Sequence, residues 1–418
     1  MPKCRPFALP AAKKPEVSGA DGRLFADGLI CAIAKAAMTN FRFCFCVKCG
    51  ILLNTPFEKG RPSLKMIGRL ILSAIFLILT ALMVAAASWA PELVFSFYPE
   101  FSRGVLNAIA SVTSLAPIAL WEVLALLLIL WFFYTFVRVF TQHRSILSWL
   151  AGVVLAVSVA VFLFVGLWGL NHFGPSIDET LGLDVREYSR EELIAATKYY
   201  AAQANEYAPE VARRADGTAE LAGFSALSTQ AGEGYDALAK QNPAFSGGLG
   251  RVKSLASAKL FSYFGNTGIF VCFTAEACVN PDTYEAWIPF TMCHELAHRQ
   301  AVAAEDEANF CAYLACMESS RADFLYSGAF AAYIYCSNAL YKVDRSAADE
   351  IFYSLSAGVQ ADIHAANEHY AQYDGAVQEA AQKVNDAYLK AFNETSGVQS
   401  YGEAADLLIA WYLQKSES

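Results

Sequence analysis

The sequence predicts a mainly α-helical membrane protein, in which three N-terminal transmembrane helices precede an external, mostly helical α+β domain with a small β-sheet. The chain of 418 residues is 56% hydrophobic and only 17% charged, whereas soluble domains carry about 25% charged residues. The apolar residues are concentrated in three long runs, and charged residues return after the third. The formal net charge of -9 argues against the basic surface that nucleic acids require. We expect a lipid bilayer, and no nucleic acid, as a partner.

Each apolar run is long enough to cross the hydrocarbon core of a membrane, which takes about 20 residues in a helix. We expect transmembrane helices over residues 66–89, about 115–137 and about 146–170. Three such runs separated by short polar loops are difficult to bury in a soluble core. The second run contains Glu122, which is either a functional group within the membrane or a residue that bonds at the outer interface or within the bundle.

The positions of basic residues predict the orientation of these helices. Lys65 and Arg69 lie at the start of the first run, and Arg138 and Arg144 lie between the second and third. Lys and Arg accumulate on the cytoplasmic side of a membrane. The N-terminus is therefore expected in the cytoplasm, and the chain after residue 170 is expected outside the cell membrane.

Residues 1–65 form the first of three predicted regions, followed by a transmembrane anchor over residues 66–170 and an external domain over residues 171–418. The first region has no clear periodicity, and we expect a poorly structured extension, as would result if translation naturally starts at Met66. Cys44, Cys46 and Cys49 lie close together there, but they lack a second pair at the spacing of a zinc site.

The external domain shows repeated helical patterns. Ser189 and Glu192 form a capping box at the start of one helix, because each side chain can satisfy a free backbone amide of the other residue. We expect helices near residues 189–207, 223–239, 290–299, 305–318, 323–341, 347–373, 375–392 and 402–414. Residues 269–274 are rich in β-branched and aromatic side chains, which predicts a strand. This strand could form one half of a hairpin.

The motif H-E-x-x-H at residues 294–298 is the main functional signal. On a helix, His294 and His298 lie four residues apart on one face and can bind one zinc ion, while Glu295 reaches a water molecule on the metal. This is the arrangement of a zinc metallopeptidase, with Glu295 as the general base. The alternative is that both histidines lie on an ordinary helix face.

A catalytic zinc site uses three protein ligands and leaves a fourth position open. Glu305 begins the next expected helix and is the predicted third ligand, with Glu307 as the competing residue. Asn309 lies one turn after Glu305 and is predicted to hydrogen-bond a ligand histidine. The other role of Glu307 is a favourable charge at a helix N-terminus.

The HExxH motif followed by Glu305 and Asn309 resembles the gluzincin class of zinc peptidases. More closely, the chain resembles a bacterial family of membrane-anchored HExxH proteins that is described only as a domain of unknown function. The resemblance covers the three apolar runs, the segment 167–171, residues 273–277 and 289–310, and the C-terminal segments 385–390 and 400–402. One departure is Ala301, where a glycine is expected to turn the chain between the two ligand helices.

The resemblance implies a zincin-like domain with one zinc ion per chain that hydrolyses peptide bonds of a peptide or protein substrate. Tyr401 is the predicted donor to the oxyanion of the transition state, with His364, His369 and Tyr388 as the alternatives. In gluzincins an edge strand before the zinc helix often aligns the substrate by strand addition. Here the predicted substrate strand consists of Phe273, Thr274, Ala275 and Glu276.

The motif also allows two other functions. A sensor or scaffold could bind metal or peptide without turnover, but a binding module has no need of the general base Glu295. An intramembrane protease would carry its motif within a transmembrane helix, whereas here the motif lies between polar segments. The external cysteines leave two possibilities, because Cys272 and Cys278 can form a disulfide across a hairpin or stay buried as small apolar residues.

Overall fold

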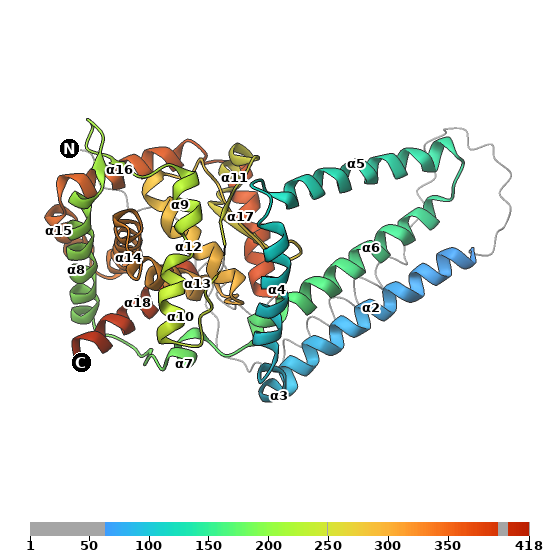
Figure 1. Ribbon diagram of the computed structural model, residues 1–418, viewed down its shortest axis with the longest axis horizontal. Helices are drawn as coiled ribbons and strands as arrows, with labels where there is room; N and C mark the ends of the chain where they lie inside the picture. Colours follow the sequence, from blue (N-terminus) through green and yellow to red (C-terminus); the bar gives the residue numbers. More distant parts are fainter. Residues whose placement is uncertain (1–62, 249, 392–399, 418) are drawn as a thin grey trace. The chain divides into compact units, whose positions relative to one another are not determined.

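The computed structural model describes residues 63–248, 250–391 and 400–417 (Figure 1). The predicted extension over residues 1–65 lies almost wholly outside the described residues. By their internal contacts, the described residues form a large unit, of residues 95–126 and 167–417, and a small unit, of residues 63–94 and 127–166. This division differs from the predicted boundary at residue 170, because the segment between the first two apolar helices belongs to the large unit.

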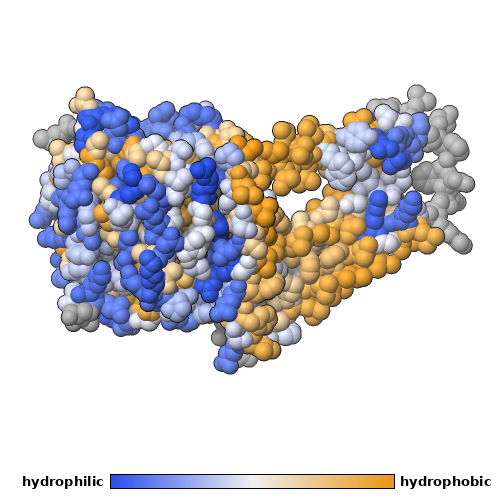
Figure 2. Space-filling view, viewed as in Figure 1, coloured by the Kyte–Doolittle hydropathy of each residue, from blue (hydrophilic) through white to orange (hydrophobic). Residues whose placement is uncertain are grey.

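The described residues include three helices that are long and apolar enough to span a membrane. They are α2 (Leu64–Trp89), α5 (Leu120–Thr141) and α6 (Ile146–Leu167), and apolar side chains cover them (Figure 2). The three predicted spans are therefore present as helices, although the second begins at Leu120 and not near residue 115. Within the small unit, Arg69 of α2 donates a hydrogen bond to the Ser148 carbonyl of α6 at 2.6 Å.

The large unit is mostly helical. Its helices are α4 (Tyr98–Thr113), α7 (Ile177–Leu181), α8 (Arg190–Tyr207), α9 (Phe224–Gln230), α10 (Glu233–Gln241), α11 (Ala258–Phe264), α12 (Ile288–Arg299), α13 (Glu305–Met317), α14 (Ala322–Val343), α15 (Arg345–Ser354), α16 (Ala357–Ala371), α17 (Ala376–Ala391) and α18 (Ser400–Glu417). Its short turns of helix are η1 (Gly169–Phe173), η2 (Ala208–Glu210) and η3 (Glu285–Trp287), whereas the short helix α3 (Pro91–Phe95) belongs almost wholly to the small unit.

Most of the expected helices are present, and their ends follow local signals. The predicted capping box is confirmed, because the Ser189 hydroxyl accepts from the Glu192 amide and the Glu192 carboxylate accepts from the Ser189 amide. Two expected helices are each divided in two, over residues 223–239 and 347–373. In the second case, α15 ends at Ser354, and Ser356 caps α16 by accepting from the Val359 amide. The sequence analysis did not predict α4.

A three-stranded sheet lies beside α12. Its strands are β3 (Lys253–Ser254), β4 (Gly268–Val271) and β5 (Glu276–Val279), in the order β3-β5-β4. The β4–β5 pair is an antiparallel hairpin in which Gly268 lies opposite Val279, and β3 is parallel to β5. The predicted hairpin is thus present, but its first strand ends at Val271. A second, two-stranded ribbon joins β1 (Ala212–Arg213) to β2 (Ala219–Glu220).

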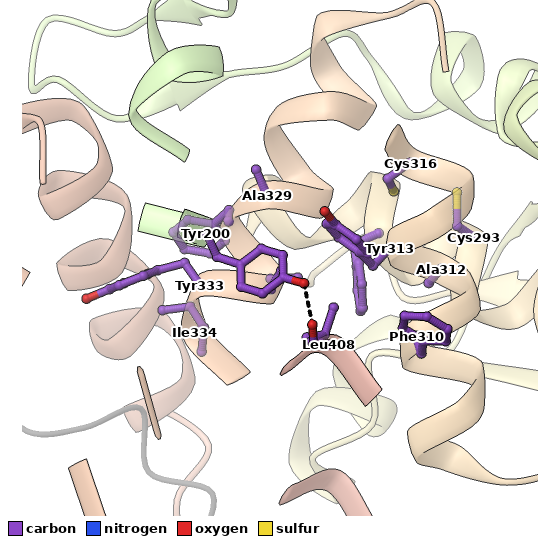
Figure 3. Close-up of a cluster of buried hydrophobic side chains, with 14 of the residues drawn as sticks. Tyr200, Cys293, Phe310, Ala312, Tyr313, Cys316, Ala329, Tyr333, Ile334 and Leu408 are labelled. Atoms are coloured by element: carbon purple, nitrogen blue, oxygen red, sulfur yellow. Dashed lines mark hydrogen bonds between the residues drawn. The ribbon is translucent and has the colours of Figure 1, made fainter. Parts of the chain in front are cut away.

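The hydrophobic core of the large unit lies between α8, α12, α13, α14 and α18. Tyr200 of α8 is fully buried and donates a hydrogen bond of 2.6 Å to the Leu408 carbonyl of α18 (Figure 3). The Tyr313 ring of α13 packs edge-on against Tyr200, with the ring centroids 5.4 Å apart. The six described cysteines are all free and buried, so the disulfide alternative between Cys272 and Cys278 is not observed.

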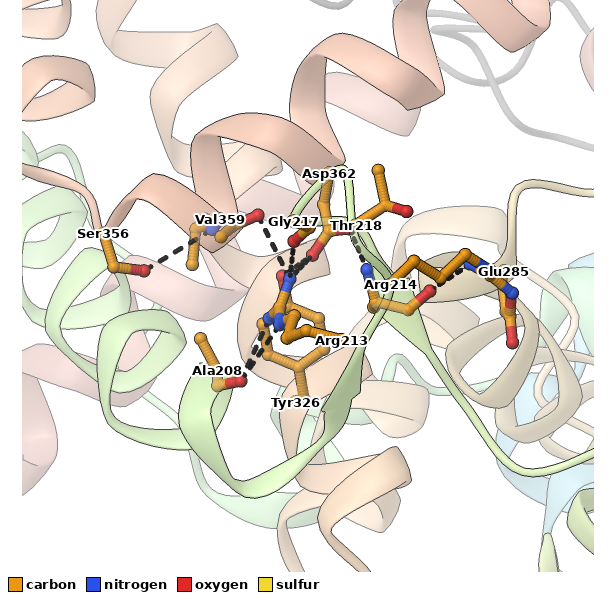
Figure 4. Close-up of polar contacts among 12 residues, drawn as sticks. Ala208, Arg213, Arg214, Gly217, Thr218, Glu285, Tyr326, Ser356, Val359 and Asp362 are labelled. Carbon is orange, nitrogen blue, oxygen red and sulfur yellow. Dashed lines mark hydrogen bonds and ion pairs between the residues drawn. The ribbon is translucent and has the colours of Figure 1, made fainter.

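A polar network joins the β1–β2 ribbon to α14 and α16. Asp362 of α16 is completely buried, and its carboxylate accepts hydrogen bonds from the Arg213 guanidinium, the Ala219 amide and the hydroxyls of Tyr284 and Tyr326 (Figure 4). Both carboxylate oxygens have donors, so this buried charge is fully compensated.

A second buried carboxylate ties the start of α5 to the sheet within the large unit. Glu276 of β5 accepts hydrogen bonds of 2.8 Å from the backbone amides of Leu120 and Trp121. Those amides have no partner within their own helix, so the carboxylate caps α5. The Lys253 ammonium pairs with the same carboxylate and is itself buried.

Glu122, in the first turn of α5, forms the reciprocal contact from the helix to the segment before α11. Its carboxylate accepts hydrogen bonds of 2.8 and 2.9 Å from the amides of Ala256 and Ser257, which precede α11. Of the two interpretations of Glu122, these contacts favour bonding at the end of the helix.

Candidate metal centre

The HExxH motif lies on α12, in which every residue is buried. Pro289 occupies the first turn, where a missing amide proton costs nothing. His294 and His298 share one face of the helix, and their Nε2 atoms are 3.1 Å apart. Both imidazoles therefore point to the same place.

The carbonyl of Val302 fixes the ring of His298. Nδ1 of His298 lies 2.8 Å from that oxygen, so Nδ1 carries the proton and Nε2 keeps its lone pair toward His294. Burial, followed by the nearby His294, lowers the pKa of His298 to about 4. The ring is therefore neutral at pH 7, which is the form that binds metal.

The chain reverses direction between α12 and α13 at Ala301. Its φ is 73°, in the left-handed region, which is costly for a residue with a Cβ. The amide of Val302 donates to the Ala297 carbonyl at 3.2 Å and closes the end of α12. The position at which the sequence analysis expected a glycine therefore has the backbone conformation that glycine favours, although alanine occupies it.

This turn places Glu305, the first residue of α13, beside the two histidines. Its Oε2 lies 3.3 Å from Nε2 of His294, and its Oε1 lies 3.8 Å from Nε2 of His298. The three residues offer ligand atoms that all lie within 4.8 Å of one another. Donor atoms on a tetrahedral zinc ion at about 2.0–2.2 Å are separated by about 3.3–3.6 Å, so this donor set fits zinc in both chemistry and spacing.

Glu307 has a different contact. Its Oε1 accepts a hydrogen bond of 3.1 Å from the Ile177 amide, at the start of α7. The structure thus brings Glu305 to the histidines and Glu307 to the end of another helix.

Asn309, the predicted hydrogen-bond partner of a ligand histidine, adjoins His294. Burial lowers the pKa of His294, but the hydrogen bond and charge of Glu305 outweigh it, and Asn309 adds to the net increase. Tyr335 donates to Oδ1 of Asn309 at 3.0 Å. Among the described residues, Nδ1 of His294 and Nδ2 of Asn309 have no partner. Rotating the amide by 180° would satisfy both, since the oxygen would then accept the Nδ1 proton.

Glu295 is buried beside these ligands. Burial raises the pKa of its carboxyl to about 8, and its Oε2 has no hydrogen-bond partner among the described residues. Strand β4 passes very close, because a Cβ added to Gly268 would lie 2.3 Å from Oε1 of Glu295. The Glu295 carboxylate fits beside β4 because Gly268 has no side chain.

Two residues that the sequence analysis did not select border the site. Trp168 donates from Nε1 to the His298 carbonyl at 2.9 Å, and its ring packs edge-on against His172. Burial lowers the pKa of His172 to about 4, while the charge of Glu305 acts in the opposite direction. Tyr388 of α17 lies with its hydroxyl 3.4 Å from Nε2 of His172. No motif identifies His172, because it comes from a segment distant in sequence from α12.

The remaining predicted site residues are Tyr401 and the four residues of the substrate strand. Tyr401 belongs to α18, but its side chain lies outside the described residues. The predicted substrate strand is misplaced. Phe273, Thr274 and Ala275 form the turn between β4 and β5, and Glu276 begins the central strand, where it caps α5. Among the described residues, the edge strand next to Glu295 is β4.

The family model described as a protein of unknown function, DUF3810, matches residues 97–409. The chain belongs to the DUF3810 family. The match begins at the residue before α4 and ends within α18, so the DUF3810 region includes α4, the apolar helices α5 and α6, and the whole candidate metal centre. No curated protein and no solved structure matches the chain.

Proposed function

We propose that this DUF3810 protein is a membrane-anchored, zinc-dependent peptidase that hydrolyses peptide bonds outside the cytoplasmic membrane. The observation that carries the proposal is the convergence of His294, His298 and Glu305 beside Glu295, whose buried Oε2 has no partner among the described residues. A structural ion-pair network does not require such a carboxylate. A general base does, because it must keep a free lone pair for the proton it receives.

The residues of the site have separate roles in the proposed hydrolysis. His294, His298 and Glu305 would hold one zinc ion, which when bound supplies Lewis-acid activation of water and of the scissile carbonyl. Glu295 accepts a proton from the attacking water and passes it to the leaving amine. The raised pKa of the Glu295 carboxyl lies close to neutral pH. The group is therefore suited both to accept a proton from water and to donate it to the amine.

The surroundings supply alignment and charge stabilisation. Strand β4 has a free edge among the described residues, and an extended peptide that adds to it would pass Glu295 at Gly268. His172 and Tyr388 form a hydrogen-bonding pair near Glu305 and are the described side chains best suited to donate to an oxyanion.

The anchoring part of the proposal rests on the three apolar helices and the distribution of basic residues. With the N-terminus in the cytoplasm, the large unit lies outside the membrane. Proteinase treatment of intact spheroplasts should then degrade the large unit and spare the loop near Arg144. Protection of the large unit would contradict this orientation.

The metal site is tested on the full-length chain purified in detergent. Elemental mass spectrometry should find about one zinc per chain, as three protein ligands with an open position imply. Glu305→Gln should lose the zinc, and Glu307→Gln, as a matched control on the same helix, should keep it. If the folded protein takes up no zinc after reconstitution, the histidines form an ordinary helix face. Zinc binding without cleavage of any peptide in a diverse library would favour the sensor alternative.

A further inference from the structure

Helix α4 has an exposed apolar face that the proposed peptidase function does not explain. Phe97, Phe101, Val112 and Leu115 are 57%, 53%, 68% and 84% exposed. With Val105 and Ala108, which lie between them, they are spaced three or four residues apart and form one stripe along the helix. We call these six residues the apolar stripe.

The other faces of α4 are already used. Tyr98, Ser102, Leu106 and Ala110 form one face and are buried. The remaining face carries polar side chains, including Arg103, which donates a hydrogen bond of 2.6 Å to the Ala244 carbonyl. The helix thus has three faces: one packed, one polar and one apolar but exposed. Figure 2 shows apolar side chains gathered in this region.

The chain itself indicates what covers the apolar stripe. Helix α4 follows α2, which ends at Trp89, and precedes α5, which begins at Leu120. A few residues separate it from each of these candidate spans, so both of its ends are tethered to the same side of a membrane. The hydroxyl of Ser102 also donates a hydrogen bond of 2.7 Å to the carbonyl of Leu167, where the third span α6 ends.

We propose that the apolar stripe of α4 lies in the lipid surface of the membrane as an interfacial helix, in addition to the three spans. An exposed apolar face bounded by a polar face, on a helix that lies between two spans, is suited to the boundary between headgroups and acyl chains. The contact continues beyond the helix, because the Thr113 hydroxyl bonds to the Thr274 carbonyl of the turn that carries the half-exposed Phe273.

This contact does not depend on peptidase activity. If the proposed function also holds, Trp168, which follows α6 directly and bonds to His298, keeps the metal centre close to the membrane surface. Peptide bonds near a membrane would then be the accessible substrates.

The test places a diazirine-bearing amino acid at single positions of the full-length chain in nanodiscs of phosphatidylethanolamine and phosphatidylglycerol. Phe101 and Val112 are the test positions. Tyr353 on α15 and Val343 at the end of α14 are matched controls, because they are 68% and 62% exposed and their helices lie across the large unit from α4 (Figure 1). After irradiation, lipid adducts are measured by mass spectrometry.

About tenfold more lipid adduct at the two test positions than at the controls is expected for an interfacial helix. Equal labelling at all four positions would overturn the proposal. Crosslinks from Phe101 or Val112 to residues 1–62 or to a second copy of the chain would also overturn it, because protein and not lipid would then cover the apolar stripe. None of these outcomes depends on zinc binding or cleavage, so the result is separate from the test of the proposed function.

Discussion

Two buried carboxylates in the large unit differ in how they are bonded. Asp362 accepts hydrogen bonds from four donors, including the Arg213 guanidinium, and both of its oxygens have partners. Glu295 is buried to a similar degree, but its Oε2 has no partner among the described residues and its pKa is raised to about 8. The Asp362 carboxylate therefore has hydrogen bonds to both of its oxygens, whereas Oε2 of Glu295 has none among the described residues.

The difference indicates what each carboxylate does. A buried charge with a full set of donors stabilises the native arrangement, and removing it leaves those donors without partners. A buried carboxyl without donors destabilises the fold, and it is retained where its free lone pair has a use. Asp362 is thus interpreted as structural, and Glu295 as functional. The following predictions test this distinction.

The largest effect is expected for Glu295→Gln. The amide has the shape of the carboxyl but cannot accept a proton, so cleavage of a peptide substrate should fall by about 10²–10⁴-fold. The melting temperature should stay close to that of the wild type, because no hydrogen bond to Oε2 is lost. Cleavage of a fluorogenic peptide and thermal unfolding in detergent measure the two quantities. A large loss of stability would make Glu295 a structural residue like Asp362.

Asp362→Ala should show the opposite pattern. It leaves the partly buried guanidinium of Arg213 and three other donors without their acceptor, so the free energy of unfolding should fall by about 3–5 kcal/mol. Urea titration followed by tryptophan fluorescence measures this. Asp349→Ala is the control, since the Asp349 pair with Arg345 is exposed and its loss should change stability by less than about 0.5 kcal/mol. Equal effects of the two substitutions would contradict the structural role.

Gly268→Ala should separate catalysis from metal binding. The new Cβ would occupy the space of the Glu295 carboxylate and displace it, while the three ligands stay in place. A displacement of about 1 Å can reduce activity by about 10²-fold. Zinc content should be unchanged by elemental analysis. Gly223→Ala, where a Cβ meets nothing within 4 Å, is the matched control and should keep full activity. Full activity in Gly268→Ala would mean that the carboxylate does not need its present position.

The smallest effect is expected for Ala301→Gly, which should raise stability. The φ of 73° costs alanine about 1–2 kcal/mol, whereas glycine adopts it freely but loses about 0.5–1 kcal/mol of chain entropy. A net gain of about 0.5–1 kcal/mol should appear in the same urea titration. Ala312→Gly, inside α13, should instead lower stability by about 2 kcal/mol, because the helix-propensity cost adds to the loss of a buried methyl group. If both variants are destabilised alike, the turn is not strained.

Much of the local structure could be predicted from the sequence. The three apolar helices follow from hydropathy, and the capping box at Ser189 follows from residues three positions apart. The approach of His294 to His298 follows from helix periodicity. These features depend on residues within a few positions of one another, whose relative geometry the backbone itself restricts.

The surroundings of the candidate site depend on contacts between segments that are far apart in the sequence. Glu276 was expected to align substrate and instead caps α5, because the start of that helix, 156 positions earlier in the chain, packs against the sheet. Trp168 meets His298 across 130 positions, and Gly268 meets Glu295 from a different element. Such contacts are selected by how whole helices and strands bury their apolar surface together, and no local pattern encodes which residues then become neighbours. The sequence predicted the three ligands of the candidate metal centre, and the packing of distant segments determined what surrounds them.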